Sequence, residues 1–408
     1  METLSPFGWI LLVVTWVVAI RWLWQVCAAL FGLSRMPDLS RAVHVPCVRS
    51  ESALAQLTVV VPARNEEHAI EATLRSLLAI EGIAIEIIAV DDRSTDGTGK
   101  IMDRIAAEAA SGRPASKNAL RVHHVAQLPD GWTGKTHAMA LAARMTTTPW
   151  LLFTDGDVIF RADCLARAVA YAERDGADHV VLFPTLIFYS RGERMMIGFF
   201  QVFSTWATRP WKVADARARD FLGIGAFNLI RRRVYDAMGG FEFLRMEVLE
   251  DVRLGYEVKH QGFAQRAVYG PGLIRIHWAT GAFGIINNLT KNAFAIFRFQ
   301  LLPLLGASIG LASLCLLPFM GFLLAPWAGH WIYPASLLVV ACLLVLYRYY
   351  QRPSGISFLY ALTFPVAASL FLYALLRSVV MTLWRGGVVW RGTLYPLREL
   401  RKQCGPLW

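Results

Sequence analysis

Two aspartates, Asp155 and Asp157, stand one residue apart at the end of an apolar run, LLFTDGDVIF at residues 151–160. Burying a carboxylate without a partner is costly, so a pair in this position needs a reason. One interpretation is a turn, because Asp and Gly favour turns after strands. The other is a divalent cation site, because hard cations take clustered carboxylate oxygens. The stretch alone leaves both interpretations open.

A second acidic pair, Asp91 and Asp92, ends another apolar run, IEIIAVDD at residues 85–92. Between these runs, apolar residues recur at helical spacing, which predicts strands alternating with helices. That order is typical of a mostly parallel sheet covered on both faces, with ligands beyond the carboxyl ends of the strands. Both acidic pairs should therefore lie at one edge of the sheet. This favours a shared site for a nucleotide and a metal over two unrelated turns.

The elements that must position these acids follow from the same patterns. The predicted strands lie within residues 57–67, 85–98, 120–125 and 149–158, and the predicted helices are residues 69–80, 98–110 and 137–147.

The composition indicates membrane segments, because the chain of 408 residues is 55% hydrophobic, only 17% charged, and contains 14 Trp. The apolar residues concentrate at the two ends of the chain. Residues 9–33 predict a retained N-terminal anchor rather than a cleaved signal peptide, since residues 1–7 hold no Lys or Arg and no small-residue cleavage site follows. Three more candidate spans are residues 301–325, 331–347 and 356–384.

These segments imply a division of the chain into four parts. We expect an anchor at residues 1–34, a domain of ordinary polarity at residues 50–298, membrane segments at residues 299–385 and a basic tail at residues 386–408. Three basic residues, Arg35, Arg41 and Arg49, follow the anchor closely. By the positive-inside rule they predict that the middle domain is cytoplasmic.

Four simple spans would conflict with the tail, because they would carry its basic residues to the opposite side of the membrane. A re-entrant segment would remove the conflict, and Pro303, Pro318 and Pro365 favour broken helices in this region. We therefore expect a cytoplasmic tail. Its basic residues are Arg385, Arg391, Arg398, Arg401 and Lys402.

The net charge of +11 does not indicate a nucleic-acid partner. Many basic residues flank apolar segments, where the positive-inside rule and anionic lipid head groups explain them. No nucleic-acid-binding motif accompanies them. The six cysteines form no C-x-x-C pair, which fits a reduced, cytoplasmic setting without zinc.

Five motifs occur in order along the middle of the chain: VVPARNEE (60–67), VDDRSTDGT (90–98), GWTGK (131–135), TDGDV (154–158) and EDVRLG (250–255). Together, over about residues 57–257, they resemble family 2 glycosyltransferases. The resemblance implies a GT-A fold with a mostly parallel sheet. One N-terminal anchor and about three C-terminal spans further resemble the lipid-directed branch, which includes ceramide glucosyltransferases and carotenoid and hopanoid-associated glycosyltransferases. This branch implies an integral protein of the inner or plasma membrane.

The resemblance assigns a first group of residues to the nucleotide of a nucleotide-sugar donor. Pro62, Arg64 and Glu66 match the loop that holds the base and ribose, although Arg64 and Glu66 are also what an ordinary surface pair would contain. Asp92, with Asp91 beside it, matches the residue that hydrogen-bonds the base. The alternative for these two acids is a solvated turn.

A second group is assigned to the diphosphate and the metal. Lys135 enters a predicted helix, where a cation beside N-terminal amides suits a diphosphate; the alternative is a helix-start lysine without a ligand. Asp157 matches the ligand of Mg²⁺ or Mn²⁺, which assists the leaving nucleoside diphosphate as a Lewis acid. Asp155 would support the metal or the sugar. His277 is a further metal or phosphate ligand, or a packed residue beside Trp278.

The resemblance also names the acids on the acceptor side. Asp251 matches the catalytic base and Glu250 a supporting acid, because an inverting transfer needs a carboxylate that reaches the acceptor hydroxyl. The alternative is an amphipathic helix whose first-turn acids are favoured by its dipole. Residues 223–232 and 238–241 match the segment that shapes the acceptor side.

One motif of the polymerising members, Q-x-x-R-W, is missing from the sequence, which indicates transfer of one sugar rather than chain growth. Residues 388–395, after the last span, contain Trp390 and Arg391 as further candidates for the site. Residues 194–212 and 288–300 are aromatic with basic residues, as in helices that lie in a membrane interface or in a buried core.

We therefore expect a membrane-bound inverting glycosyltransferase that moves one sugar from a nucleotide-sugar donor, UDP-linked, to a hydroxyl or carboxyl group of a lipid. The alternatives are a processive polysaccharide synthase, a transporter with a nucleotide-sensing domain, and an inactive scaffold of the same fold. Few ionisable residues in the predicted spans, Arg21 and Arg377 among them, speak against a transporter.

Overall fold

The computed structural model describes residues 4–41, 56–111 and 118–403. The chain divides into two compact units. The helical unit comprises residues 1–35, 188–209 and 278–386, and the sheet unit comprises residues 36–187, 210–277 and 387–408. Some predictions fall outside the described residues; they concern Arg49, Cys47, Cys404 and the domain boundary at residue 50.

The sheet unit is built on a seven-stranded sheet with the order β3-β2-β1-β4-β8-β6-β9. Among the described strands of this sheet, β8 alone runs antiparallel to its neighbours. The prediction of a mostly parallel sheet is therefore confirmed. The strands are β1 (Leu57–Ala63), β2 (Ile85–Asp92), β3 (Ala119–Val125), β4 (Trp150–Phe153), β6 (His179–Leu182), β8 (Asn228–Arg231) and β9 (Gln265–Val268).

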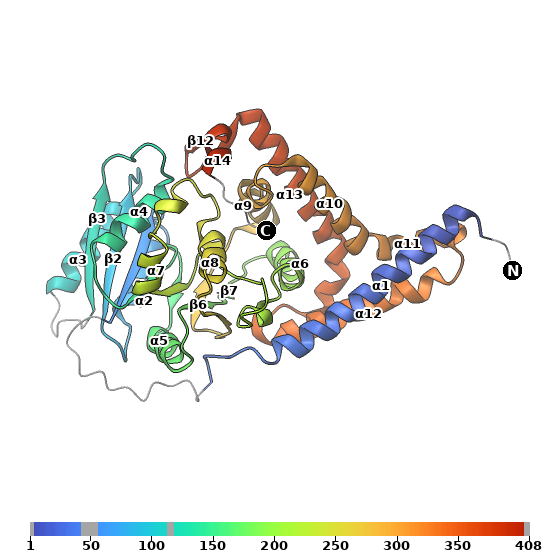
Figure 1. Cartoon of the computed structure of the whole chain (residues 1–408), viewed down its shortest axis with the longest axis horizontal. Coiled ribbons are helices and arrows are strands. Elements are labelled where there is room, and N and C mark those ends of the chain that lie inside the picture. The colour runs from blue at the N-terminus through green and yellow to red at the C-terminus, as the bar shows by residue number, and fades with distance from the viewer. Residues whose placement is uncertain (1–3, 42–55, 112–117, 404–408) are drawn as a thin grey trace. The chain divides into compact units, whose positions relative to one another are not determined.

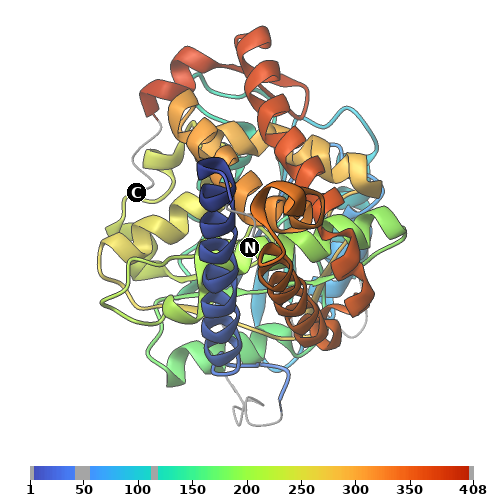
Figure 2. The ribbon, with the colours of Figure 1, turned by 90° about the vertical axis from the view of Figure 1, so that its right-hand side faces the viewer.

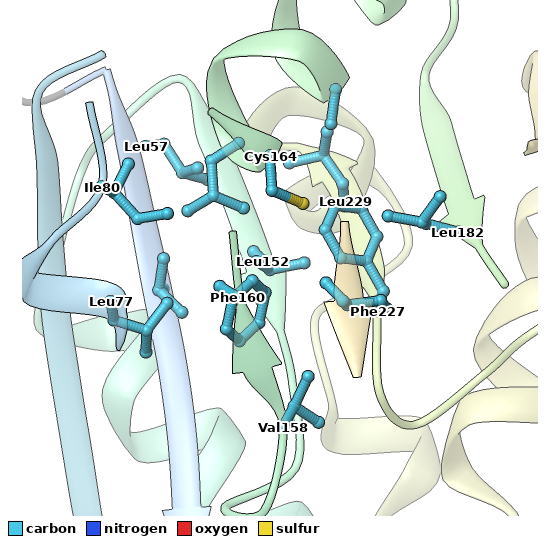
Figure 3. Packing of buried hydrophobic residues seen from close by; sticks show 14 of the residues in the cluster. Leu57, Leu77, Ile80, Leu152, Val158, Phe160, Cys164, Leu182, Phe227 and Leu229 are labelled. Atoms are coloured by element: carbon cyan, nitrogen blue, oxygen red, sulfur yellow. The ribbon is translucent and has the colours of Figure 1, made fainter. Parts of the chain in front are cut away.

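Alternation along the strands gives each face of the sheet its own core. One face packs against α2 (Ile70–Leu78), α3 (Thr98–Ser111) and α5 (Cys164–Arg174). Figure 3 shows part of this cluster, with Leu77 of α2, Cys164 of α5 and Leu152 of β4 among the labelled residues. The other face packs against α4 (Gly134–Arg144), α7 (Arg232–Ala237) and α8 (Glu250–His260). The sheet is thus covered on both sides, as the alternating pattern predicts.

A small three-stranded sheet continues from the end of β4. It has the order β5-β10-β7, and β10 is antiparallel to β5 and parallel to β7. Its strands are β5 (Ile159–Phe160), β7 (Thr185–Leu186) and β10 (Ile274–Ile276), and two short 3₁₀ helices nearby in sequence are η2 (Pro210–Lys212) and η3 (Glu242–Leu244).

The predicted boundaries differ from the structure at two places that matter for the site. Helix α4 begins at Gly134, three residues before the predicted start at residue 137, because the Thr133 side chain accepts a hydrogen bond from the backbone N–H of Thr136 and caps the helix. Strand β4 ends at Phe153, so Asp155 and Asp157 lie in the loop that follows. The earlier helix start places Lys135 in the first turn of α4.

The helical unit contains three helices long and apolar enough to cross a membrane, Pro6–Leu33, Ile332–Ser354 and Phe358–Arg385. They are α1 (Pro6–Leu33), α12 (Ile332–Ser354) and η4 (Phe358–Thr363) with α13 (Phe364–Arg385). Helix α1 lies along α12, and both views show the two side by side (Figures 1 and 2).

The segment predicted as a single span at residues 301–325 is instead a bent pair, α10 (Leu301–Cys315) and α11 (Leu317–Ala328), with an angle of 69° between them. Pro318 lies in the first turn of α11. Because proline has no N–H, it leaves the carbonyl of Leu314 without its helical donor. The indole N–H of Trp22 donates to that carbonyl at 2.9 Å. The break is therefore stabilised by packing against α1.

The helical unit also includes α6 (Arg191–Thr208) and α9 (Gly281–Ile296). Both lie within the region predicted as the middle domain. The ring of Phe199 in α6 packs at a tilted angle against the rings of Phe364 and Phe371. Helix α9 packs along α13. Arg377, the ionisable residue singled out in the last span, donates from Nη1 to Asn287 and Thr290 of α9 at 2.9 and 2.8 Å.

The chain returns to the sheet unit after α13 as a hairpin, β11 (Gly387–Trp390) and β12 (Thr393–Pro396), followed by α14 (Leu397–Gln403). Its two-residue turn is Arg391–Gly392, and both residues have positive φ, 47° and 79°. This is the type I′ geometry whose twist matches that of paired strands. The buried members of the tail, Val388, Trp390, Tyr395 and Leu400, pack within the unit.

Candidate active site

The end of β2 places Asp92 against the first turn of α4. A Cβ on Gly134 would lie 1.9 Å from Asp92 Oδ2, so only glycine allows the helix to start beside this carboxylate. Arg93 Nε donates to Asp92 Oδ1 at 2.8 Å, and Arg64 Nη1 lies 3.8 Å from Oδ2. Asp92 is thus buried, charged and held by two cations, at the position where the motif comparison expects the base.

Asp91 lies on the opposite side of β2, because successive side chains of a strand alternate between faces. Its Oδ1 accepts from the backbone N–H of Ser94 at 3.1 Å, and its Oδ2 lies 3.0 Å from His124 Nδ1. The hydrogen bond from Asp91, and a second from Asp103, raise the pKa of His124. The structure therefore separates Asp91 from Asp92 and pairs Asp91 with groups near α3.

Lys135 joins acids from two distant parts of the chain. Its Nζ lies 2.6 Å from Asp155 Oδ1 and 2.5 Å from Glu250 Oε1, and its side chain is buried. Burial alone would lower the pKa of Lys135, but Asp155 and then Glu250 raise it above its ordinary value. The charged lysine ties the loop after β4 to the first residue of α8. The contact of Lys135 with a diphosphate stays a prediction.

Asp157 has the side-chain oxygen best suited to bind a cation. Its Oδ1 is buried and has no hydrogen-bond partner among the residues that the structure describes. Burial, and then the neighbouring Asp155 and Glu66, raise the pKa of Asp157 to about 7. An orphaned buried carboxylate oxygen beside a second carboxylate is a donor set that suits Mg²⁺ or Mn²⁺. The residues present therefore fit the expected metal, although no group of three candidate ligands is gathered within the described parts of the chain.

The position of His277 follows from the small sheet. Strand β10 is antiparallel to β5, with Arg275 opposite Ile159. His277 directly follows the last residue of β10, and Asp157 lies two residues before the first residue of β5. This arrangement is compatible with a role beside the metal, which stays a prediction.

The first turn of α8 presents Glu250 and Asp251 to the site. Gly223 packs directly on the helix, since a Cβ there would lie 1.7 Å from the backbone oxygen of Asp251. Gln265 of β9 holds the same segment by accepting from the N–H of Leu222 and donating to its carbonyl, both at 3.0 Å. Residues 223–232, expected to shape the acceptor side, thus begin against the predicted base.

Burial, and then the adjacent Glu250, raise the pKa of Asp251 to about 7. Lys135 acts in the opposite direction and keeps it from rising further. A carboxylate with a pKa near the working pH is well matched to accept a proton from an acceptor hydroxyl. The first-turn acids of α8 are therefore more than helix-dipole partners, because Glu250 pairs with Lys135 and Asp251 is poised to titrate near neutrality.

The C-terminal hairpin meets the same site. Arg391 Nη2 lies 2.7 Å from Glu66 Oε1, and Arg64 Nη1 donates to Thr393 Oγ1 at 3.1 Å. The backbone N–H of Gly134 donates to the Tyr395 hydroxyl at 3.1 Å. The segment at residues 388–395 was singled out in the sequence, but its strand pairing was not predicted. The strand-forming residues VVW and TLY, on either side of the dipeptide RG, could have indicated a hairpin.

Arg93 and Tyr395 of the site lie in segments that the sequence analysis singled out, but no role was predicted for either residue. Arg93 belongs to the motif VDDRSTDGT, yet its bond to Asp92 depends on a positive φ of 57°. Tyr395 is separated from Gly134 by 261 positions. No local pattern announces either contact.

Comparison with known proteins agrees with this geometry. The model of the family described as glycosyl transferase family 2 matches residues 58–253. Residues 58–253 form a family 2 glycosyltransferase domain. The glycosyltransferase domain contains the expected site residues except His277 and the further candidates Trp390 and Arg391, and the fold is GT-A.

Curated relatives of the chain carry the name 4,4′-diaponeurosporenoate glycosyltransferase. One from Staphylococcus haemolyticus is 22% identical over 249 residues, which is 60% of this chain and 62% of that protein. One from Staphylococcus aureus is 26% identical over 205 residues, which is 49% of this chain and 50% of that protein. The chain thus spans about half to three fifths of the length of these relatives.

Among solved structures, the chain is similar to the mannosyltransferase PcManGT from Pyrobaculum calidifontis, whose structure holds GDP-Man and Mn²⁺. The TM-score is 0.51 with 20% identity, and the match covers 92% of this chain and 99% of that one. At this identity the likeness establishes the fold, which is the GT-A fold of the glycosyltransferase domain.

Proposed function

We propose that the chain is a membrane-bound inverting glycosyltransferase that moves a single sugar from a nucleoside diphosphate donor, UDP-linked, to a hydroxyl or carboxyl group of a lipid. The observation that carries the proposal is the ion pairing of Lys135 with both Asp155 and Glu250. It brings the D-x-D loop and the E-D helix, which are 93 positions or more apart, to one site.

The donor side is formed by the ends of β1 and β2 and the start of α4. Asp92 would accept a hydrogen bond from the base, once Arg93 and Arg64 release it in part. Pro62, the last residue but one of the fully buried β1, and Glu66 would hold the base and ribose. The first-turn amides of α4, with Lys135, face an anion favourably.

Asp157, with Asp155 and His277 beside it, would hold Mg²⁺ or Mn²⁺. A cation held there supplies Lewis-acid stabilisation of the charge that develops on the departing diphosphate. The role of the chain's own residues is to hold that cation. Lys135 keeps Asp155 in place, and Asp157 offers an oxygen that has no other partner among the described residues.

On the acceptor side, Asp251 would take the proton from the lipid's hydroxyl as the new glycosidic bond forms, or orient an acceptor carboxylate. Glu250 is buried and paired with Lys135, so it acts by holding the charge pattern around Asp251. A lipid acceptor is supported by the three apolar helices and by the names of the relatives, which specify a carotenoid acid. The absence of Q-x-x-R-W from the sequence favours single transfer over a processive synthase.

A scaffold without activity is the second candidate, and the electrostatics oppose it. Asp157 and Asp251 both have pKa values raised to about 7, mainly by burial. Such groups destabilise the folded state at neutral pH, since folding must place a charge where it is poorly solvated. A structural protein gains nothing from this cost, whereas a catalyst does.

The tail supports a specific membrane topology. Strands β11 and β12 belong to the same unit as the glycosyltransferase domain, so the chain must cross the membrane an even number of times between residues 277 and 387. Helices α12 and α13 supply two crossings, which leaves the bent pair α10–α11 as a re-entrant segment. The basic residues after α1 and in the tail then lie on one side, the cytoplasmic side.

This topology predicts the fate of a protease-sensitive tag placed after Trp408. In sealed inside-out membrane vesicles we expect complete removal of the tag, and in right-side-out vesicles full protection. A tag on a known periplasmic protein serves as the control for vesicle orientation. Protection in the inside-out preparation would mean that α10–α11 crosses the membrane and that the re-entrant assignment is wrong.

The proposed reaction is tested by donor turnover. Full-length protein in lipid nanodiscs is incubated with Mn²⁺, a lipid extract and each of UDP- and GDP-linked sugars, and release of nucleoside diphosphate is measured. We expect release from one donor that depends on the lipid extract, with a glycosylated lipid formed in equal amount. If the protein binds none of the donors in the panel and turns over none of them, the inactive scaffold is supported instead.

A further inference from the structure

We propose that the C-terminal hairpin, residues 387–396, is a wall of the donor site and that Arg391 at its turn binds the donor diphosphate. This inference rests on the proposed function, since it assigns one more binding residue to the same nucleotide-sugar site. It concerns a segment outside residues 58–253, which the family model matches.

The turn is built to present Arg391. A non-glycine residue with a φ of 47° is in the left-handed region, which is sterically unfavourable for most L-residues, and Asn or Gly would suit the position better. The Trp390–Thr393 pair closes the hairpin around the two turn residues. An arginine in this place therefore calls for a function at the tip rather than for turn formation.

The hairpin touches each of the three loops expected to hold the donor. Thr393 accepts from Arg64 in the loop after β1, and Arg391 pairs with Glu66 in the same loop. The Tyr395 hydroxyl accepts from Gly134 at the start of α4. Tyr395 is also an electrostatic neighbour of Arg93, which follows β2.

The charges around the site indicate why a second cation is needed. Lys135, the cation expected to meet the diphosphate, is committed to Asp155 and Glu250 and balances charges that the chain already holds. A diphosphate would add about two further negative charges to a site that already includes Asp157 and Glu66. The described ion pairs join Arg391 to Glu66, whereas the neighbouring Arg64 and Arg93 share the buried Asp92. The planar fork of Arg391 suits two phosphate oxygens.

The contacts also define what changes on binding. In the structure Glu66 accepts a hydrogen bond from Arg391, and the Tyr395 hydroxyl accepts one from the N–H of Gly134. A diphosphate offers the Gly134 N–H a stronger acceptor than the neutral Tyr395 hydroxyl, because hydrogen bonds to an ionised group are about twice as strong as neutral ones. It offers the Arg391 guanidinium two phosphate oxygens in place of the single Glu66 oxygen. Arg391 would exchange Glu66 for the phosphate, and the Gly134 N–H would exchange the Tyr395 hydroxyl for it. The hairpin would thereby be held closer over the donor.

The test measures binding of UDP, GDP and the corresponding nucleosides to the full chain in lipid nanodiscs, by calorimetry in EDTA and again with Mn²⁺. The variant is Arg391→Asn, which makes the turn Asn-Gly, the most favoured type I′ pair, and so removes the charge without weakening the hairpin. Arg391→Lys keeps the charge but not the fork. Arg398→Asn, an exposed residue of α14, is the control with the same change of charge.

We expect Arg391→Asn to weaken nucleoside diphosphate binding roughly tenfold to a hundredfold, the effect of losing a charge-assisted hydrogen bond. Nucleoside binding should be unchanged, Arg391→Lys should fall between wild type and Arg391→Asn, and Arg398→Asn should match wild type. Equal binding of the diphosphate by wild type and Arg391→Asn overturns the inference, as does an equal loss for nucleoside and diphosphate. If wild type itself binds no nucleoside diphosphate, the proposed function fails, which is a separate result.

Discussion

Replacing Asp251 with Asn is expected to lower kcat by roughly a hundredfold to ten-thousandfold, the contribution typical of a positioned general base. The substitution keeps the shape of the side chain and its place in the first turn of α8, but it removes the group that would accept the proton of the acceptor. Its KM for the donor should change little, because Asp251 lies on the acceptor side. Transfer is measured as glycosylated lipid formed per minute at saturating donor.

The pH profile adds a second test of the same residue. Burial and Glu250 raise the pKa of Asp251 to about 7, and a base works only when it is deprotonated. The rate of wild type should therefore rise about tenfold for each pH unit up to about 7 and then level off. In Asp251→Asn the residual rate should no longer rise with pH over this range. Asp236→Asn, an exposed aspartate paired with Arg232, is the matched control and should keep both the rate and the profile. Full turnover by Asp251→Asn would show that another group is the base.

Replacing Asp157 with Asn is expected to lower metal-dependent transfer by at least roughly a hundredfold, because Lewis-acid assistance is worth several kcal/mol and each 1.4 kcal/mol is about tenfold in rate. Asn can offer one neutral oxygen where the cation needs a charged one. The measurement is turnover across a Mn²⁺ titration, together with the paramagnetic signal of bound Mn²⁺ in the presence of nucleoside diphosphate.

Folding is the natural objection to this experiment, and the structure answers it. The Asp157 carboxylate is buried beside Asp155 and Glu66, so removing its charge relieves repulsion. The variant should unfold at a temperature equal to or above that of wild type in EDTA, while the stabilisation of wild type by Mn²⁺ with nucleoside diphosphate should be lost. A variant that keeps wild-type Mn²⁺ binding and turnover would remove Asp157 from the metal site.

Local patterns in the sequence were enough to predict the main strands, the membrane segments and the family of the protein. The apolar runs that became β1, β2 and β4 were recognisable because a strand buried on both faces needs consecutive apolar residues. The acids that follow them were recognisable for the opposite reason, since carboxylates at strand ends have no place in a core. The spans were evident from hydropathy, because a bilayer requires about twenty apolar residues. The glycosyltransferase family followed from five short motifs in order.

The structure alone decided how those pieces face one another. The adjacent Asp91 and Asp92 diverge to opposite faces of the sheet, where Asp91 meets His124 and Asp92 meets the start of α4. The predicted span at residues 301–325 is broken beside Pro318, and Trp22 supplies the missing hydrogen bond. Each of these outcomes depends on a partner that is close in space and distant in the chain.

The hairpin is the extreme case. Arg391 contacts Glu66 although 325 positions separate them in the sequence. The intervening chain includes residues 278–386 of the helical unit. Strand and helix patterns arise from hydrogen bonds and side-chain periodicity within a few residues, so a sequence displays them directly. The pairing of an arginine after the last span with a glutamate near the first strand depends on the route of the intervening chain. Sequence therefore determined which groups this protein has for its chemistry, and tertiary packing decided which of them share a site.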